Sequence, residues 1–259
     1  MNQDHLLVEF EGPIMILTLN RPESLNSFSQ EMINGLAEAC LGAQTRDDIK
    51  VIVLKGAGRS FSAGGDVKTM GQASPNDVYE HIGKLNRCIL AMKETEIPII
   101  AAVHGFAAGA GFNLAMACDL IVAAEDSKFA LSFSQVGLIS DGGGSYFLPK
   151  LIGPHLAKQF FFSAEPISAE RLYQLGVINY LTPLERLEDE VYSLAAKLAN
   201  GPVAAFGKMK KLIDASYQST LEEMLEQERL NQALMISTED HQEGISAFKE
   251  KRQPVFTGK

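Results

Sequence analysis

The chain has 259 residues, of which 46% are hydrophobic and 21% charged, and its formal net charge is −9 at pH 7. This composition is typical of a soluble globular enzyme and gives no indication of disorder or of a fibre. The negative charge argues against broad binding of nucleic acid or of anionic membranes, because both require a cationic surface. It leaves room for a phosphorylated ligand, which needs only a few placed cations or N–H groups.

The sequence predicts a cytoplasmic protein with neither a membrane nor a nucleic acid as partner. Residues 1–5 lack the basic start and apolar stretch of a signal peptide, and the apolar run at residues 97–103 is too short to span a bilayer. The three cysteines, Cys40, Cys88 and Cys118, have no paired spacing. We interpret them as buried, reduced thiols that pack as small hydrophobic groups.

In chain order, the first half alternates short β-branched runs with amphipathic stretches. Residues 7–10 and 14–19 flank a Glu-Gly-Pro turn and predict a hairpin. The residues 27–30 (SFSQ) predict a capping box that opens a helix ending near residue 46. The pattern then predicts a buried strand, a helix and three further strands at residues 51–54, 75–93, 99–103, 119–124 and 128–131.

From about residue 166 the pattern is helical, apart from a predicted strand at residues 177–181. Ser168 and Pro202 predict helix starts, the latter as the first helical residue. No linker or charge block separates this part, so we divide the chain into a core at residues 1–165 and a helical C-terminal subdomain at residues 166–259. The apolar stripes of these helices must cover their own core or another subunit.

Four segments concentrate small and polar residues next to predicted strands or helix starts, where α/β proteins place ligand sites. They are residues 21–26 (RPESLN), 61–68 (FSAGGDVK), 105–115 (GFAAGAGFNLA) and 137–144 (GLISDGGG). The second and third allow backbone amides to approach an anion, and two such amides would make an oxyanion hole. The alternative is that the glycines serve only tight turns and close packing. Neither segment is a dinucleotide-binding fingerprint.

Together, the four segments resemble the crotonase superfamily of enoyl-CoA hydratases and isomerases, and the resemblance covers nearly the whole chain. It implies an α/β fold, namely a spiral of ββα repeats with a C-terminal helical trimerisation region. It also implies a homotrimer or a dimer of trimers. The ligand implied is an acyl-CoA thioester, so coenzyme A enters as part of the substrate and no separate cofactor is expected.

The resemblance also assigns functional positions in this sequence. The two amides that hold the thioester oxygen fall on Gly65 and Ala110. The loop that contacts coenzyme A matches Ala63, Gly65, Asp66, Val67 and Lys68. Arg21 resembles a position near the nucleotide part, and Lys251 or Arg252 one that reaches a phosphate bound by a neighbouring subunit. For these basic residues, solvated surface charge is an equally weighted alternative.

Both glutamates that hydratases use to handle water are replaced, because their positions align with Asn113 and Phe133. An amide cannot act as a base near neutral pH, and a phenyl ring tends to exclude water. Asp141 remains, and it resembles the acid of dienoyl-CoA isomerases and of the epoxyphenylacetyl-CoA isomerase group. Partial burial beside Phe133 should raise its pKa. The alternative for Asp141 is a helix N-cap.

The sequence therefore predicts an isomerase that shifts a double bond or rearranges an acyl-CoA through an enolate, with Asp141 as acid and base. An enoyl-CoA hydratase, thioester hydrolysis or decarboxylation, and a weakly active or inert CoA-binding protein remain alternatives. Ser140 and Ser145 lack the nucleophile-elbow motif of serine hydrolases, and the five histidines lack metal-binding spacing. The basic cluster at residues 208–211 is interpreted as a solvated helix face. The acyl group and the pathway, fatty acid or aromatic degradation, are not specified.

Overall fold

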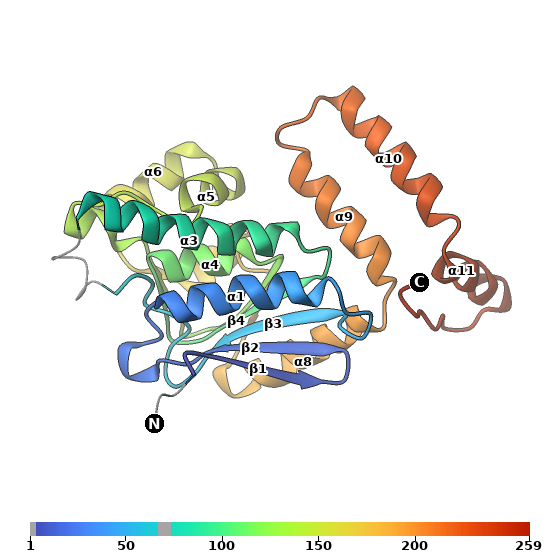
Figure 1. Cartoon of the computed structure of the whole chain (residues 1–259), viewed down its shortest axis with the longest axis horizontal. Helices are drawn as coiled ribbons and strands as arrows, with labels where there is room; N and C mark the ends of the chain where they lie inside the picture. The colour runs from blue at the N-terminus through green and yellow to red at the C-terminus, as the bar shows by residue number, and fades with distance from the viewer. Residues whose placement is uncertain (1–3, 67–73) are drawn as a thin grey trace.

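Two β-sheets organise the chain, and the structure, a computed structural model, describes residues 4–66 and 74–259 (Figure 1). In the six-stranded sheet β1 is antiparallel to β2, and all other neighbours are parallel. Its strands, in spatial order, are β1 (Leu6–Glu11), β2 (Ile14–Leu19), β3 (Val51–Gly56), β4 (Ile99–Val103), β6 (Leu120–Ala124) and β9 (Tyr180–Thr182). The smaller sheet consists of β5 (Phe106–Ala108), β7 (Lys128–Ala130) and β8 (Ile167–Ser168).

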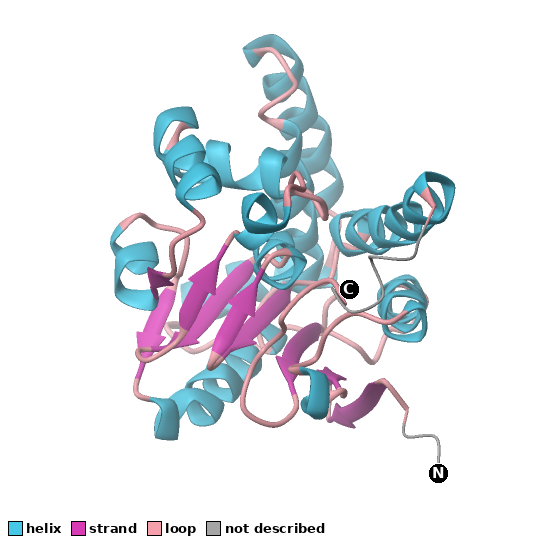
Figure 2. Cartoon of the chain, turned by 90° about the vertical axis from the view of Figure 1, so that its left-hand side faces the viewer, coloured by secondary structure: helices cyan, strands magenta, loops and turns pink. Residues whose placement is uncertain are grey.

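Helices lie on both faces of the larger sheet (Figure 2). In chain order they are α1 (Gln30–Ala43), α3 (Pro75–Glu94), α4 (Ala110–Ala117), α5 (Gly144–Ile152), α6 (Pro154–Ser163), α7 (Ala169–Gln174), α8 (Leu187–Ala199), α9 (Val203–Ala215), α10 (Leu221–Met235) and α11 (Glu239–Glu250). The 3₁₀ turns are η1 (Pro22–Ser24), η2 (Ser132–Val136) and η3 (Leu184–Arg186). This mixed α/β arrangement is the predicted fold class.

The strands read as continuous apolar runs because the sheet is buried on both faces. In β3, Ile52 and Leu54 point into the core shared with α1, α3 and α4, whereas Val51 and Val53 point into a second core closed by α8. Successive side chains alternate between the two faces of a strand, so one run of four residues serves both cores. All four side chains are buried.

Several local predictions hold, and some boundaries differ. The hairpin is confirmed, with Gly12 at φ +56° in its turn. The cap of α1 is Ser29 and not Ser27, because the Ser29 hydroxyl accepts the Met32 N–H at 3.1 Å while the Ser27 hydroxyl bonds the Arg21 guanidinium. That helix ends at Ala43, before the expected end near residue 46. Pro202 is the N-cap of α9 and not its first residue.

The three cysteines are free and buried, as predicted. Burial raises the pKa of Cys40 to about 12, so its thiol stays protonated at neutral pH. In the part of the chain that the structure describes, no helix has the length and apolar character needed to cross a membrane.

The last three helices, α9 to α11, form an arm that stands apart from the body that holds the sheets (Figure 1). The sequence pattern places the start of the helical subdomain at residue 166. In the structure, β9 still pairs with β6 and α8 still packs on the sheet, so α9 is the first helix to leave the body.

Candidate active site

Two Gly-rich loops, residues 62–65 and 107–110, run side by side at the start of α4. Ser62 donates its N–H to Phe106 O at 3.1 Å, and Ala108 donates its N–H to Ser62 O at 2.9 Å. A Cβ added to Gly64, at φ +79°, would lie 2.8 Å from the backbone nitrogen of Ala110. Glycine is therefore required at residue 64, and its absent side chain lets the loop carrying Gly65 reach the first turn of α4.

Ala110 is the first residue of α4, and the N-cap, Gly109, provides no side chain to bond the first N–H groups. The unpaired N–H groups and the helix dipole make such an N-terminus favourable for negative charge. The packing thus brings the segments of Gly65 and Ala110 together, as the sequence predicted. Their roles as oxyanion donors stay a prediction at this point.

The predicted CoA-contacting positions divide into four groups. Ala63 lies in the same loop as Gly65, and it donates its N–H to Leu25 O at 2.8 Å. Arg21 donates to Ser27 O at 2.8 Å and pairs with Asp66 at 3.5 Å, so its guanidinium is engaged within the chain. Val67 and Lys68 lie outside the described residues. Lys251 is the C-cap of α11, in the arm and not beside α4.

Asn113 projects from α4 and is fully buried. Its side-chain nitrogen donates to the backbone oxygen of Asp141 at 2.8 Å and to the hydroxyl of Ser140 at 3.1 Å. A Cβ on Gly144 would collide with the Asn113 and Ser140 side-chain oxygens. Asn113 therefore holds the turn that carries Asp141, a contact that its spacing in the sequence did not indicate.

The Asp141 carboxyl does not cap α5, so the N-cap alternative is wrong. The helix begins at Gly144 with Gly143 as its N-cap and no side-chain cap. Asp141 contributes only its backbone carbonyl, which accepts the Gly144 N–H at 3.1 Å. The cap therefore lies two residues later than the motif suggested, and Asn113 bonds the turn that precedes it.

Burial raises the pKa of Asp141 to about 6, opposed by a hydrogen bond from its own backbone amide. Among the described residues, none hydrogen-bonds the buried Oδ1 of this carboxyl. A buried carboxylate costs free energy unless it is paired, which is the physical reason for the shift. A carboxyl that titrates near neutral pH can both remove and return a proton.

Phe133 lies in η2 and packs against the main core. Its ring is 3.6 Å from where a Cβ of Gly109 would stand, so it faces the N-cap of α4. An aromatic ring therefore lies beside the first turn of α4. Within residues 4–66 and 74–259, no cluster of three His, Cys, Asp or Glu side chains could hold a metal.

Comparison with known proteins agrees with this geometry. Residues 9–259 match the sequence family described as enoyl-CoA hydratase/isomerase. The chain is 39% identical to the 1,2-epoxyphenylacetyl-CoA isomerase of Escherichia coli K12, over 99% of each chain. It is 34% identical to a probable enoyl-CoA hydratase of Rhodobacter capsulatus, over 100% of each. A crystal structure of an enoyl-CoA hydratase from Polaromonas sp. JS666 superposes with a TM-score of 0.94 at 35% identity, covering 97% of this chain and 99% of that one. The chain therefore belongs to the enoyl-CoA hydratase/isomerase family of the crotonase superfamily.

Proposed function

We propose that the protein isomerises or rearranges an acyl-CoA thioester through an enolate. In this proposal the amides of Gly65 and Ala110 bind the thioester oxygen, and Asp141 moves the proton. The observation that carries the proposal is the state of Asp141: its side chain is partly buried and does not cap α5, and its pKa is raised to about 6.

The reaction needs only one mobile proton. The Asp141 carboxylate takes a proton from the acyl chain, and the electron pair of the broken C–H bond moves toward the thioester oxygen as the enolate forms. The two amides and the positive end of α4 stabilise that oxygen, at about 3 to 4 kcal/mol per donor. Protonated Asp141 then returns the proton to another carbon, which completes the shift.

A pKa near 6 suits this double role, because both protonation states are then accessible near neutral pH. The substrate brings its own coenzyme A, and no step of this scheme calls for a separate cofactor. The relative from Escherichia coli is named an isomerase, which agrees with the proposal.

Hydration is the second candidate, because the Rhodobacter capsulatus relative is named a probable hydratase. Hydration requires groups that orient and deprotonate water. Here the Asn113 side-chain nitrogen is engaged by Asp141 and Ser140, and Phe133 offers no polar atom. These two residues favour isomerisation.

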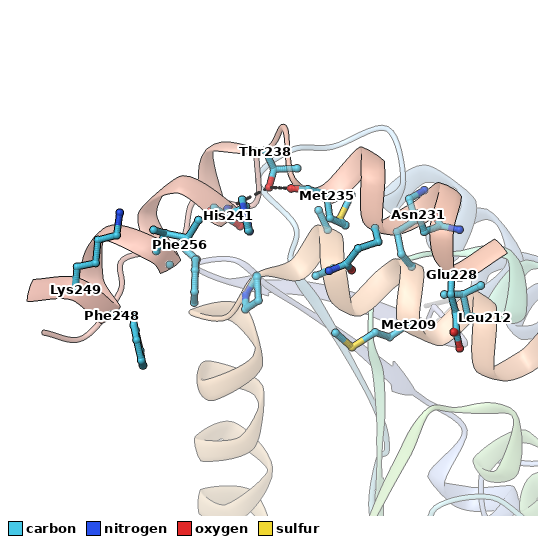
Figure 3. A pocket seen from close by; sticks show the side chains of 18 residues that line it. Met209, Leu212, Glu228, Asn231, Met235, Thr238, His241, Phe248, Lys249 and Phe256 are labelled. Carbon is cyan, nitrogen blue, oxygen red and sulfur yellow. Dashed lines mark hydrogen bonds between the residues drawn. The ribbon is translucent and has the colours of Figure 1, made fainter. Parts of the chain in front are cut away.

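We also infer that the arm assembles the chain into a homotrimer or a dimer of trimers. A groove of about 510 Å³ lies between α9, α10 and α11, lined by apolar side chains that include Met209, Leu212, Met235 and Phe248 (Figure 3). Along α10, Leu221, Leu225 and Leu234 are each more than half exposed. Apolar surface of this kind is typical of subunit contacts. Sedimentation of the full chain tests the assembly, and a monomer at micromolar concentration would contradict it.

Replacing Asp141 tests the proposed chemistry. Asp141→Asn keeps the shape of the side chain but removes its ability to transfer a proton. We therefore expect turnover to fall by about 10²- to 10⁴-fold. Binding of the acyl-CoA should persist. Turnover is measured on straight-chain 3-enoyl-CoA, 2-enoyl-CoA and ring-epoxidised phenylacetyl-CoA, and binding by titration calorimetry.

The matched control is Asp126→Asn, because Asp126 is exposed in the turn between β6 and β7. It should leave turnover unchanged. Undiminished turnover in Asp141→Asn would contradict the proposal. Faster hydration of crotonyl-CoA than isomerisation of any 3-enoyl-CoA would favour the hydratase.

A further inference from the structure

We infer that Asn26 is a positioning residue, which sets the orientation of the Gly65 amide through the loop that carries it. The inference rests on the oxyanion-hole part of the proposed function and is independent of the reaction that follows. Asn26 is completely buried, so it acts through the loop and not by touching the substrate.

The Asn26 side chain binds the backbone of the stretch that leads into the Gly65 loop. Its Nδ2 donates to the carbonyl oxygens of Ala57 and Ser60, both at 2.8 Å, and lies 3.2 Å from that of Phe61. Its Oδ1 accepts the Arg21 N–H at 2.9 Å. One amide side chain therefore satisfies several carbonyls of the same stretch and ties them to the end of β2.

The backbone around Asn26 continues this attachment up to Gly64. Asn26 O accepts the Ser62 hydroxyl at 2.8 Å, and the same hydroxyl accepts the Gly64 N–H at 3.1 Å. Leu25 O accepts the Ala63 N–H at 2.8 Å. The two residues before Gly65 are thus fixed by the turn at residues 25–26.

The residue after Gly65 is fixed from the same region. Asp66 pairs with the Arg21 guanidinium at 3.5 Å, and Arg21 also donates to Ser27 O at 2.8 Å. Phe28 donates its N–H to Gly64 O at 2.7 Å. The chain is consequently held on both sides of Gly65, which leaves the direction of its amide little freedom.

The backbone at this turn is strained, because Leu25 and Asn26 both adopt the left-handed conformation, at φ +52° and φ +55°. Non-glycine residues seldom adopt it, and such strain persists where the surroundings enforce it, often near functional sites. Ser62 also packs against Gly111, where a Cβ would lie 2.8 Å from the Ser62 Cβ. The turn, the Gly65 loop and the first turn of α4 therefore form one connected unit.

The test measures polarisation of the thioester carbonyl, which requires no turnover. The probe is cinnamoyl-CoA, whose carbonyl is conjugated to an aromatic ring, so hydrogen bonds to the thioester oxygen move its ultraviolet absorption to longer wavelength. The variants are Asn26→Asp, which replaces the donor nitrogen with an oxygen facing three carbonyls, and Ser62→Ala. The control is Ser127→Ala, because Ser127 is equally buried and its hydroxyl donates to Val103 O at 3.3 Å.

With the wild type we expect a red shift on binding, which Ser127→Ala should retain. Ser62→Ala and Asn26→Asp should reduce the shift and lower kcat by about 10- to 100-fold, less than the 10²- to 10³-fold cost of deleting an oxyanion-hole donor. Affinity for free coenzyme A, which has no carbonyl at that position, should be unchanged.

The outcomes separate the two claims. No red shift with the wild type would overturn the oxyanion hole and with it the proposed function. A wild-type red shift that Ser62→Ala and Asn26→Asp both retain in full, with kcat unchanged, would overturn the positioning role alone. Because Asn26→Asp can fail to fold, Ser62→Ala decides the inference by itself in that case.

Discussion

Asp141 lowers the stability of the folded protein at neutral pH, and that cost is the source of its proposed chemistry. Its side chain is partly buried, and the buried Oδ1 has no partner among the described residues. The charged form is therefore disfavoured, which raises the pKa from the ordinary 3.8 to about 6. Such trade-offs between stability and activity are common at functional sites.

The raised pKa predicts a pH-dependent stability difference between Asp141→Asn and the wild type. Between pH 3.8 and about 6, the folded state binds more protons at Asp141 than the unfolded state does, so wild-type stability falls as the pH rises through this window. The neutral asparagine does not titrate. Above pH 6 the variant should be more stable by up to about 3 kcal/mol, and the advantage should vanish below pH 4.

Urea unfolding of both proteins at several pH values measures this difference. Asp126→Asn is compared with the wild type in the same way, because Asp126 is an exposed carboxyl. A stability difference that stays constant between pH 4 and pH 8 would show that the Asp141 carboxyl is not desolvated in the folded protein.

At the scale of elements, the first turns of α4 and α5 are placed by contacts that only small residues permit. Gly64 allows its loop to approach the Ala110 amide, and Gly144 allows α5 to begin against Asn113. Asn113 in turn bonds the Asp141 carbonyl at 2.8 Å. The loop of the proposed acid and the loop of the proposed oxyanion hole thus both contact α4, which fixes their relative position.

Replacing Gly144 should disturb the contact between α5 and Asn113 of α4. A Cβ in Gly144→Ala would collide with side-chain oxygens of Asn113 and Ser140, so we expect a loss of about 1 to 3 kcal/mol of stability together with reduced turnover. The control is Gly83→Ala in α3, where a Cβ would meet nothing within 4 Å. There alanine should stabilise the helix by about 0.5 to 1 kcal/mol. Thermal unfolding and kcat of both variants check the pair; equal effects would refute the close contact.

Elements with a local signature were predictable, and those set by distant contacts were not. The hairpin and the buried strands follow from turn chemistry and from alternation within a few residues. The Ser27 hydroxyl is bonded by the Arg21 guanidinium from outside the capping motif, and the turn at Asp141 is bonded by Asn113 from a different helix, so neither outcome follows from the motif alone. The sequence therefore indicated which loops lie side by side, but it did not reveal the contacts of Asn26 or of Asn113; the roles of Gly65, Ala110 and Asp141 stay predictions.

At the scale of the molecule, an ion network attaches the arm to the body. The sequence predicts a solvated helix face at residues 208–211, but the Lys210 side chain is only 7% exposed. Its Nζ donates to the carbonyls of Met92 and Ile97, both at 3.2 Å, and pairs with Asp119 at 2.8 Å. The expectation failed because lysines on one helix look alike in sequence, whereas packing against the α3–β4 connection distinguishes them.

Two lysines of α9 allow this attachment to be tested. Lys210→Ala removes a part-buried ion pair and leaves Asp119 with Lys93 at 3.7 Å and the Ile99 N–H at 2.8 Å. We therefore expect a loss between the value for an exposed pair, about 1 kcal/mol, and that for a fully buried pair, about 3 to 5 kcal/mol. Lys208 pairs with Glu96 on the surface with 31% of its side chain exposed, so Lys208→Ala should cost at most about 1 kcal/mol.

Thermal unfolding gives the two stabilities, and sedimentation reports whether the proposed assembly is lost with them. Because α9 carries both the ion network and one side of the apolar groove, a loosened α9 should weaken assembly and stability together in Lys210→Ala. Lys208→Ala should leave assembly intact. If Lys210→Ala matches Lys208→Ala in both measurements, packing of α9 against the body, and not the buried lysine, holds the arm in place.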